Sequence, residues 1–232
     1  MKQNKVVQLS EIEHILKRSA RYLGSTVKTN TTRYHLVNNE IKFGSIEYVP
    51  ALLKLIREIL DNSLDEFDRT NGKYANKIEM KITKDSISIK DTGRGIPVIY
   101  GVDSQGNTLD KLMPELAWTS LRAGSNFDDD ESDTTIGQNG EGSSLVCIWS
   151  TEFTGETSDG TTYFKVHCKD NMSTKVITTK PNKQKYTKVT FKPDLAKMGL
   201  EEIDSVYADL LEFDLMFLKE TYNINFNFIR EI

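Results

Sequence analysis

The residues from Val49 to Gly72 constrain the fold most, because they carry the strongest helical pattern of the chain. Apolar side chains recur there at spacings of three and four, which places them on one side of an α-helix. Pro50 near the start and Gly72 beyond the end are typical of helix boundaries. The sequence therefore predicts a helix with an apolar stripe that faces a core: Leu53, Ile56, Leu60, Leu64 and Phe67.

The residues after this helix change from helical to strand periodicity. The segments 77–82 and 86–91 alternate apolar and polar residues on either side of a turn at Lys84 and Asp85. This pattern indicates a hairpin with one buried face. Asp91 ends its second strand.

The remaining elements mix both periods. Ser10 and Glu13 form a capping-box pattern at the start of a predicted helix over 9–23, and a loop rich in Thr and Asn follows it. Further helices are predicted at 108–121, 143–150 and 201–223, and further strands at 150–157, 161–168, 173–179, 187–193 and 224–232. Because no repeated βαβ unit is visible, the predicted fold class is α+β.

Composition narrows the class of protein further. The 232 residues, 38% of them apolar, can bury one full core, and no apolar run reaches the ~20 residues of a membrane span. We therefore expect a soluble intracellular chain. The formal net charge of −4 argues against strong nucleic-acid binding by the chain as a whole. A basic stretch at 175–188 is a possible DNA-facing edge, and the alternative is a solvated hairpin loop.

Polar residues lie on the other side of the helix over 49–72. Glu58, Asn62 and Asp65 lie opposite the apolar stripe, with Glu66 beside them and no lysine among them. Carboxylate and amide oxygens in this arrangement suit a magnesium ion and a water molecule that must lose a proton. The alternative is an ordinary solvated helix face.

The stretch "IKDTGRGIP" places a carboxylate at a strand end, directly before residues with special backbone preferences. Because Gly93 and Gly95 have no Cβ, a flat ligand can come close while Asp91 accepts a hydrogen bond from its amino group. An adenine amino group fits this description, and the alternative is a tight turn with a side-chain cap.

A glycine-rich segment, "GQNGEGSS", joins the long polar segment at 122–142 to the following helix. Its glycines and the helix N-terminus can direct backbone N–H groups at a triphosphate. The pattern is not that of a Walker loop, so a nucleotide would be held by another architecture. A flexible linker is the alternative.

The acidic helix, the D-x-G-x-G strand end and the glycine-rich loop, in this order, resemble the Bergerat ATP-binding fold of gyrase, heat-shock chaperones, histidine kinases and MutL. The segments "ILKRSARYLGS", "YVPALLKLIREILDNSLDE", "SNFDDDE", "IGQNGEGSSLVCIWS" and "YTKVTFKPDL" resemble the N-terminal ATPase domain of type II DNA topoisomerases. The resemblance covers nearly the whole chain and is nearer to the eukaryotic and T-even bacteriophage branch than to gyrase. It implies a two-layer sandwich with a mostly antiparallel sheet and helices on one face.

The resemblance also implies roles for individual residues. Glu58 would be the base that activates water, Asn62 the Mg²⁺ ligand, and Asp91 the acceptor for adenine. The nucleotide site would further include Asp65, Glu66, Gly93, Arg94, Gly95, Ile96, Pro97, Ser125, Asn126, Gly137, Gln138, Asn139, Gly140, Glu141, Gly142, Ser143, Ser144 and Thr187. Glu141 departs from the family pattern, and its charge would be unfavourable beside a triphosphate unless it points outward.

For the whole protein, the resemblance implies an ATPase that closes and resets a dimeric DNA clamp in the cytoplasm, or in the host cytoplasm if the protein is viral. Residues 1–44 would form an N-terminal arm and 45–232 the ATPase domain. The transducer lysine, the cleavage domain and the tyrosine that attacks DNA have no counterpart here, so we expect an isolated ATPase domain. It would form a homodimer on nucleotide binding, helped by a transducer domain. The alternative is a nucleotide-gated dimerisation module like that of MutL or a chaperone.

Overall fold

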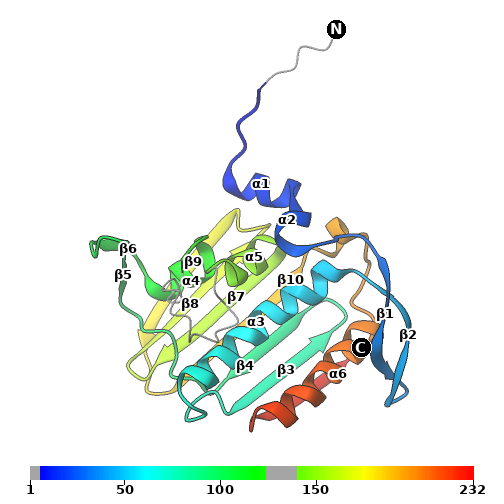
Figure 1. Ribbon diagram of the computed structural model, residues 1–232. Coiled ribbons are helices and arrows are strands. Elements are labelled where there is room, and N and C mark those ends of the chain that lie inside the picture. The colour runs from blue at the N-terminus through cyan, green and yellow to red at the C-terminus, as the bar shows by residue number, and fades with distance from the viewer. Residues whose placement is uncertain (1–5, 124–139) are drawn as a thin grey trace.

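The computed structural model describes residues 6–123 and 140–232 and shows a two-layer α+β arrangement (Figure 1). A seven-stranded sheet has the order β11-β3-β4-β10-β7-β8-β9. β11 pairs with β3 in parallel, and every other neighbouring pair is antiparallel. Its strands are β3 (Lys77–Thr83), β4 (Ile87–Asp91), β7 (Ser150–Asp159), β8 (Thr162–Lys169), β9 (Thr174–Pro181), β10 (Lys185–Pro193) and β11 (Asn225–Glu231). The predicted fold class and sheet type are confirmed.

The helices lie over one face of this sheet (Figure 1). They are α1 (Glu11–Lys17), α2 (Ser19–Leu23), α3 (Pro50–Arg69), α4 (Met113–Thr119), α5 (Gly142–Ile148) and α6 (Ser205–Thr221), with a 3₁₀ turn η1 at Leu195–Met198. The capping box of Ser10 and Glu13 is formed as predicted. The helix predicted over 9–23 is nevertheless interrupted at Arg18, which separates α1 from α2.

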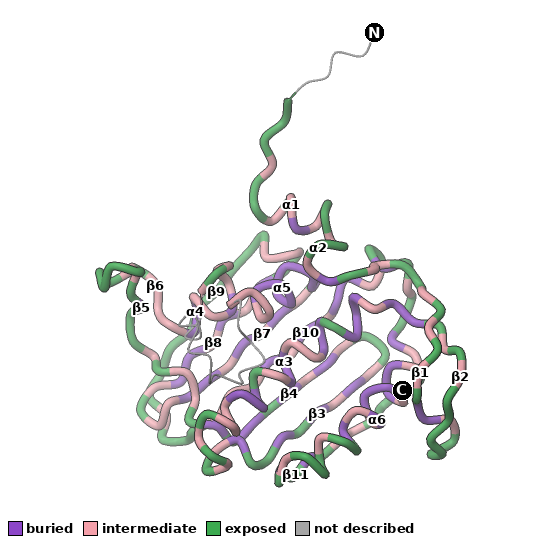
Figure 2. The backbone as a smooth tube through the Cα atoms, viewed as in Figure 1, coloured by how far each residue is buried: buried purple, intermediate pink, exposed green. Residues whose placement is uncertain are grey.

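α3 crosses the middle of the sheet and forms the centre of the core. Its predicted stripe is confirmed, since Ile56, Leu60 and Leu64 are fully buried. Beneath it, the alternate positions Ile78 and Ile89 of β3 and β4 are also buried (Figure 2). The apolar side chains that recur every three or four residues on α3 thus pack against those that alternate along the strands, and together they form one apolar layer.

Two hairpins correct the sequence prediction. β1 (Thr29–Val37) and β2 (Glu40–Tyr48) pair along their whole length where a loop rich in Thr and Asn was predicted. β-branched threonines favour strands once a partner strand is available, which outweighs their polarity. β5 (Tyr100–Val102) and β6 (Thr108–Leu112) form the second hairpin, so the helix predicted over 108–121 begins only at Met113. There Pro114 occupies the first turn, where a missing N–H costs little.

The basic stretch at 175–188 lies mostly in two strands, which confirms the strands predicted at 173–179 and 187–193. Residues 174–181 form β9, the exposed edge strand of the sheet, and 185–188 belong to β10 between β4 and β7. Lys175 points toward the helices and forms an ion pair with Glu115 of α4 at 2.5 Å.

Candidate functional site

A cavity of about 940 Å³ lies between α3, the loop after β4, the β5–β6 hairpin, α4 and the start of α5. This volume is within the range of sites for nucleotide-sized ligands. Asp91 of β4 and Glu58 of α3 both line it. The site is therefore built where the acidic side of α3, the strand end and the described part of the glycine-rich segment meet.

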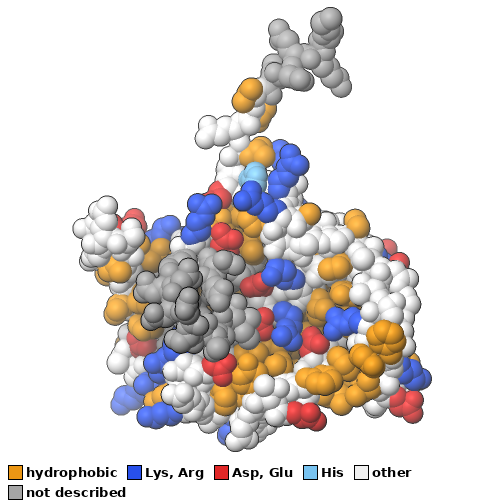
Figure 3. Space-filling model, in the orientation of Figure 1, with side chains coloured by type: hydrophobic (Ala, Val, Ile, Leu, Met, Phe, Trp, Pro, Cys, Tyr) orange, Lys and Arg blue, Asp and Glu red, His pale blue; other side chains and the backbone are white. Residues whose placement is uncertain are grey.

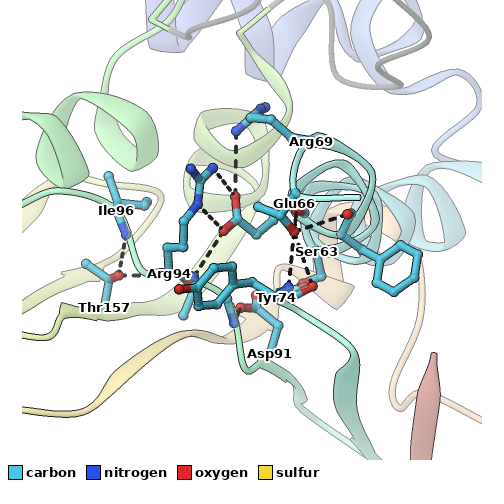
Figure 4. Close-up of polar contacts among 12 residues, drawn as sticks. Ser63, Glu66, Arg69, Tyr74, Asp91, Arg94, Ile96 and Thr157 are labelled. Carbon is cyan, nitrogen blue, oxygen red and sulfur yellow. Dashed lines mark hydrogen bonds and ion pairs between the residues drawn. The ribbon is translucent and has the colours of Figure 1, made fainter. Parts of the chain in front are cut away.

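Asp91 is 5% exposed and its two oxygens are held separately (Figure 4). Oδ1 accepts a hydrogen bond from the backbone N–H of Gly93 at 2.8 Å, and Oδ2 accepts one from the hydroxyl of Ser63 at 2.9 Å. Burial raises the pKa of Asp91 to about 6, although both hydrogen bonds act to lower it. At neutral pH the carboxylate is thus an ionised, oriented and poorly solvated acceptor.

Glu66 and Arg94 form a bidentate pair at the wall of the cavity (Figure 4). Arg94 donates from Nε to Oε1 at 2.9 Å and from its second guanidinium nitrogen to Oε2 at 3.0 Å, and its backbone N–H also donates to Oε1. Burial alone would raise the pKa of Glu66, but these bonds outweigh burial and hold the pKa below its usual value. The pair fixes the loop after β4 against α3.

The loop after β4 also contacts β7. Gly95 has φ of +77°, and a Cβ at this position would lie 2.0 Å from the carbonyl oxygen of Ser158. Only glycine can therefore occupy this position without moving the backbone of β7. The next N–H, that of Ile96, donates to the hydroxyl of Thr157 at 2.8 Å (Figure 4).

The other end of the cavity holds the remaining polar side chains of α3. Glu58 accepts a hydrogen bond from Lys54 at 2.6 Å, and a Cβ at Gly142 would lie 2.0 Å from Oε2 of Glu58. Asn62 donates from Nδ2 to the carbonyl of Glu58 at 2.7 Å and to the hydroxyl of Ser143 at 2.9 Å. Since these bonds fix the amide nitrogen, its oxygen remains available as a hard ligand.

The structure brings most of the predicted site residues together. Those that line the cavity are Glu58, Asn62, Asp65, Glu66, Asp91, Arg94, Gly95, Ile96, Pro97, Gly140, Glu141, Gly142, Ser143 and Thr187. Gly93 supports Asp91 without lining the cavity, and the hydroxyl of Ser144 turns to the carbonyl of Glu141. Ser125, Asn126, Gly137, Gln138 and Asn139 lie outside the described residues.

Two acidic residues of the predicted site have surroundings that the sequence did not indicate. Asp65 is only 3% exposed, so it lies at the buried border of α3 and not on an open polar face. Glu141 lines the cavity, and Arg122 lies 3.7 Å from its carboxylate. Because Arg122 is well exposed, this pair only partly offsets the negative charge of Glu141.

Sequence reasoning missed Lys54 and Ser63. Lys54 precedes Glu58 by one helical turn, a spacing that could have predicted their ion pair. Ser63 carried a weaker signal, because a serine inside a helix often bonds to its own backbone. Here it bonds to the neighbouring strand instead.

Comparison with known proteins gives consistent matches. The family model "Histidine kinase-, DNA gyrase B-, and HSP90-like ATPase" matches residues 48–197. The DNA topoisomerase large subunit of Enterobacteria phage T4 is 42% identical over 229 residues, which cover 98% of this chain and 43% of that protein.

Solved structures agree with this match. The ATPase region of Saccharomyces cerevisiae topoisomerase II superposes with a TM-score of 0.83 at 31% identity, covering 96% of this chain and 60% of that one. The ATPase and transducer domains of DNA topoisomerase II from Balamuthia mandrillaris give a TM-score of 0.87 at 29% identity, covering 98% and 60%. The chain thus spans less than half the length of the curated phage relative.

In the described ranges, no helix is long and apolar enough to cross a membrane.

Proposed function

This chain belongs to the family of histidine kinase-, DNA gyrase B- and HSP90-like ATPases, where it corresponds to the ATPase region of type II topoisomerases, and we propose how its site works. ATP binds in the 940 Å³ cavity, with adenine at Asp91 and the phosphates toward Glu58 and Gly142. The observation that carries this orientation is the buried carboxylate of Asp91, 5% exposed and held by Ser63 and Gly93.

Asp91 recognises adenine by accepting a hydrogen bond from the exocyclic amine. A buried carboxylate that has lost its hydrating water is stabilised strongly by a hydrogen-bond donor. A nucleobase with an amine at this position is therefore preferred over one with a carbonyl. Thr187 pairs with Asp91 across β10 and β4 and lines the same end of the cavity. Arg94 and Glu66 keep the surrounding loop in place.

Glu58 acts as the general base that takes a proton from the attacking water. Lys54 orients its carboxylate from one side, and Gly142 leaves room for it on the other. Asn62 would hold Mg²⁺ through its amide oxygen, because protein sites for Mg²⁺ commonly use one or two oxygen ligands together with the phosphates. The ion would neutralise phosphate charge. Glu58 lies one turn before Asn62, so the base and the metal ligand face the same end of the cavity.

We further propose that the whole protein is a cytoplasmic type II DNA topoisomerase. Nucleotide binding would join two copies of the chain, and the partners would be DNA and a cleavage subunit or domain. The division into an arm, 1–44, and an ATPase domain, 45–232, stays a prediction, and β2 continues across that boundary to Tyr48. The relatives reported above are topoisomerases, which does not favour the MutL-like or chaperone-like alternative.

Calorimetry with ATP and Mg²⁺, followed by turnover measurements, tests this proposal. We expect Glu58→Ala to keep much of the affinity and to lower hydrolysis by about 10²–10⁴-fold, because a general base acts in the transition state. The matched control is Glu212→Ala on α6, which does not line the cavity. Absence of ATP binding by folded protein would refute the site, whereas unchanged turnover in Glu58→Ala would refute only the role of this residue.

A further inference from the structure

The face of the seven-stranded sheet that points away from the helices is rich in lysine. Strand positions that alternate with the buried ones place eight lysines and four glutamates there, and no arginine. The lysines are Lys77, Lys81, Lys90, Lys165, Lys169, Lys180, Lys188 and Lys192, and the glutamates are Glu79, Glu152, Glu156 and Glu231. Because the whole chain has a net charge of −4, this positive excess is local.

The lysines near the middle of this face form no ion pair with a described carboxylate. Lys90 of β4 and Lys188 of β10 are direct cross-strand partners. Like charges opposite each other destabilise a sheet pair. Neither lysine forms an ion pair with a described residue. Each lysine also has a glutamate opposite it on its other side: Glu79 of β3 opposite Lys90, and Glu156 of β7 opposite Lys188. Glu156 accepts a hydrogen bond from Tyr163 at 2.6 Å.

Lysines at one end of the face behave differently. Lys81 pairs with Glu231 at 2.8 Å, and Lys192 pairs with Asp85 at 2.8 Å. The other six lysines of this face form no ion pair with a described residue, and five of them lie on the strands β4, β10, β8 and β9. We call the group Lys90, Lys165, Lys169, Lys180 and Lys188 the open lysine face.

Tyrosines support two of these ammonium groups. Nζ of Lys90 lies 5.2 Å from the ring centroid of Tyr186, and Nζ of Lys180 lies 4.8 Å from that of Tyr163. A cation held over an aromatic ring still has protons directed outward. These lysines can thus donate to an anion without first leaving a carboxylate partner.

We propose that the open lysine face binds the phosphate backbone of double-stranded DNA. The inference rests on the proposed function, since a type II topoisomerase must hold duplexes of any sequence. Lysine contacts phosphate as a point charge, and the bidentate base contacts that arginine makes are missing from this face. The surface therefore suits binding that is strong at low salt and independent of sequence.

Fluorescence anisotropy with a labelled duplex of about 30 base pairs, at salt between about 50 and 200 mM, tests the proposal. We expect salt-dependent binding by residues 1–232. Lys90→Gln/Lys188→Gln should weaken binding roughly 10- to 60-fold at about 0.1 M salt and lower the salt slope by about 1–2. Lys165→Gln/Lys169→Gln is a second variant for the same face.

The matched control removes two positive charges from a second basic cluster, which lies away from the sheet face. Lysine and arginine side chains gather around α1 and α2 (Figure 3), where Lys17 and Arg18 line a hollow of about 460 Å³. Lys17→Gln/Arg18→Gln removes the same charge and should leave DNA affinity within about twofold. Equal losses in both double variants, a larger loss in the control, or no DNA binding at about 50 mM salt would overturn the proposal.

Nucleotide affinity of the same variants separates this proposal from the proposed function. Because the open lysine face lies on the opposite side of the sheet from the helices, we expect unchanged ATP binding in both sheet-face variants. Unchanged ATP binding together with DNA affinity insensitive to these lysines would refute the DNA surface alone. Absence of ATP binding by the unsubstituted chain would refute the nucleotide site instead.

Discussion

Replacing Asp91 with asparagine should stabilise the nucleotide-free protein at neutral pH and weaken its binding of ATP. The substitution keeps the shape of the side chain and removes its charge. The N–H of Gly93 can still donate to the remaining oxygen, and the hydroxyl of Ser63 can rotate to accept from the new amide. The buried charge is therefore removed without leaving a supporting group unpaired.

The sign of the stability change follows from the pKa of Asp91. Burial raises this pKa from 3.8 to about 6, so the folded state holds the proton more tightly than the unfolded state. The free energy of unfolding consequently falls as pH rises from about 4 to 6, and the loss is complete above that window. About two pKa units correspond to about 3 kcal/mol, an upper value because the asparagine amide must itself be accommodated. Asp91→Asn should thus gain roughly 1–3 kcal/mol at pH 7.5 and almost nothing at pH 4.

Urea unfolding at both pH values and calorimetry with ATP measure the two effects. Loss of the charged acceptor should weaken ATP binding by roughly 1.5–3 kcal/mol, or about 10- to 150-fold. Asp61→Asn is the matched control: burial also raises the pKa of Asp61 to about 6, but its carboxylate lies beside Arg57 and outside the cavity. An equal gain for Asp91→Asn at pH 4 and pH 7.5, or wild-type ATP affinity, would refute this reasoning.

Three further changes test other parts of the site. Asn62→Ala should weaken ATP binding in the presence of Mg²⁺ and have little effect in its absence, and calorimetry with and without EDTA distinguishes the two cases. Gly142→Ala should lower turnover by about tenfold or more with little loss of stability, because its Cβ would displace only the flexible end of Glu58. Gly95→Ala should reduce the free energy of unfolding by at least about 2 kcal/mol, since its Cβ would meet the backbone of Ser158, and a normal melting curve would contradict this.

The elements that could be predicted from sequence are those whose own residues specify both the type of secondary structure and the face that is buried. α3 has an unbroken apolar stripe, and the β3–β4 hairpin has strict alternation, so each specifies its period and its buried face. The β1–β2 hairpin differs, because its residues are mostly polar and only pairing with each other, and packing on α6, makes them strands. Local sequence contains no such information about a partner segment.

The same distinction between local and long-range features applies to the residues of the site. Asp91 and the glycines around it were found because a strand end followed by Gly-x-Gly is a local pattern with a chemical reason. The groups that adjust Asp91 and Glu58 were not found, because a hydrogen bond from Ser63 to Asp91 joins positions 28 residues apart. That bond is possible because α3 packs against β4, and Leu60 and Leu64 of α3 belong to the same buried core as Ile89 of β4. Core packing on one side of α3 therefore determines the electrostatics on its other side, so a core substitution in α3 should change nucleotide affinity without touching the nucleotide.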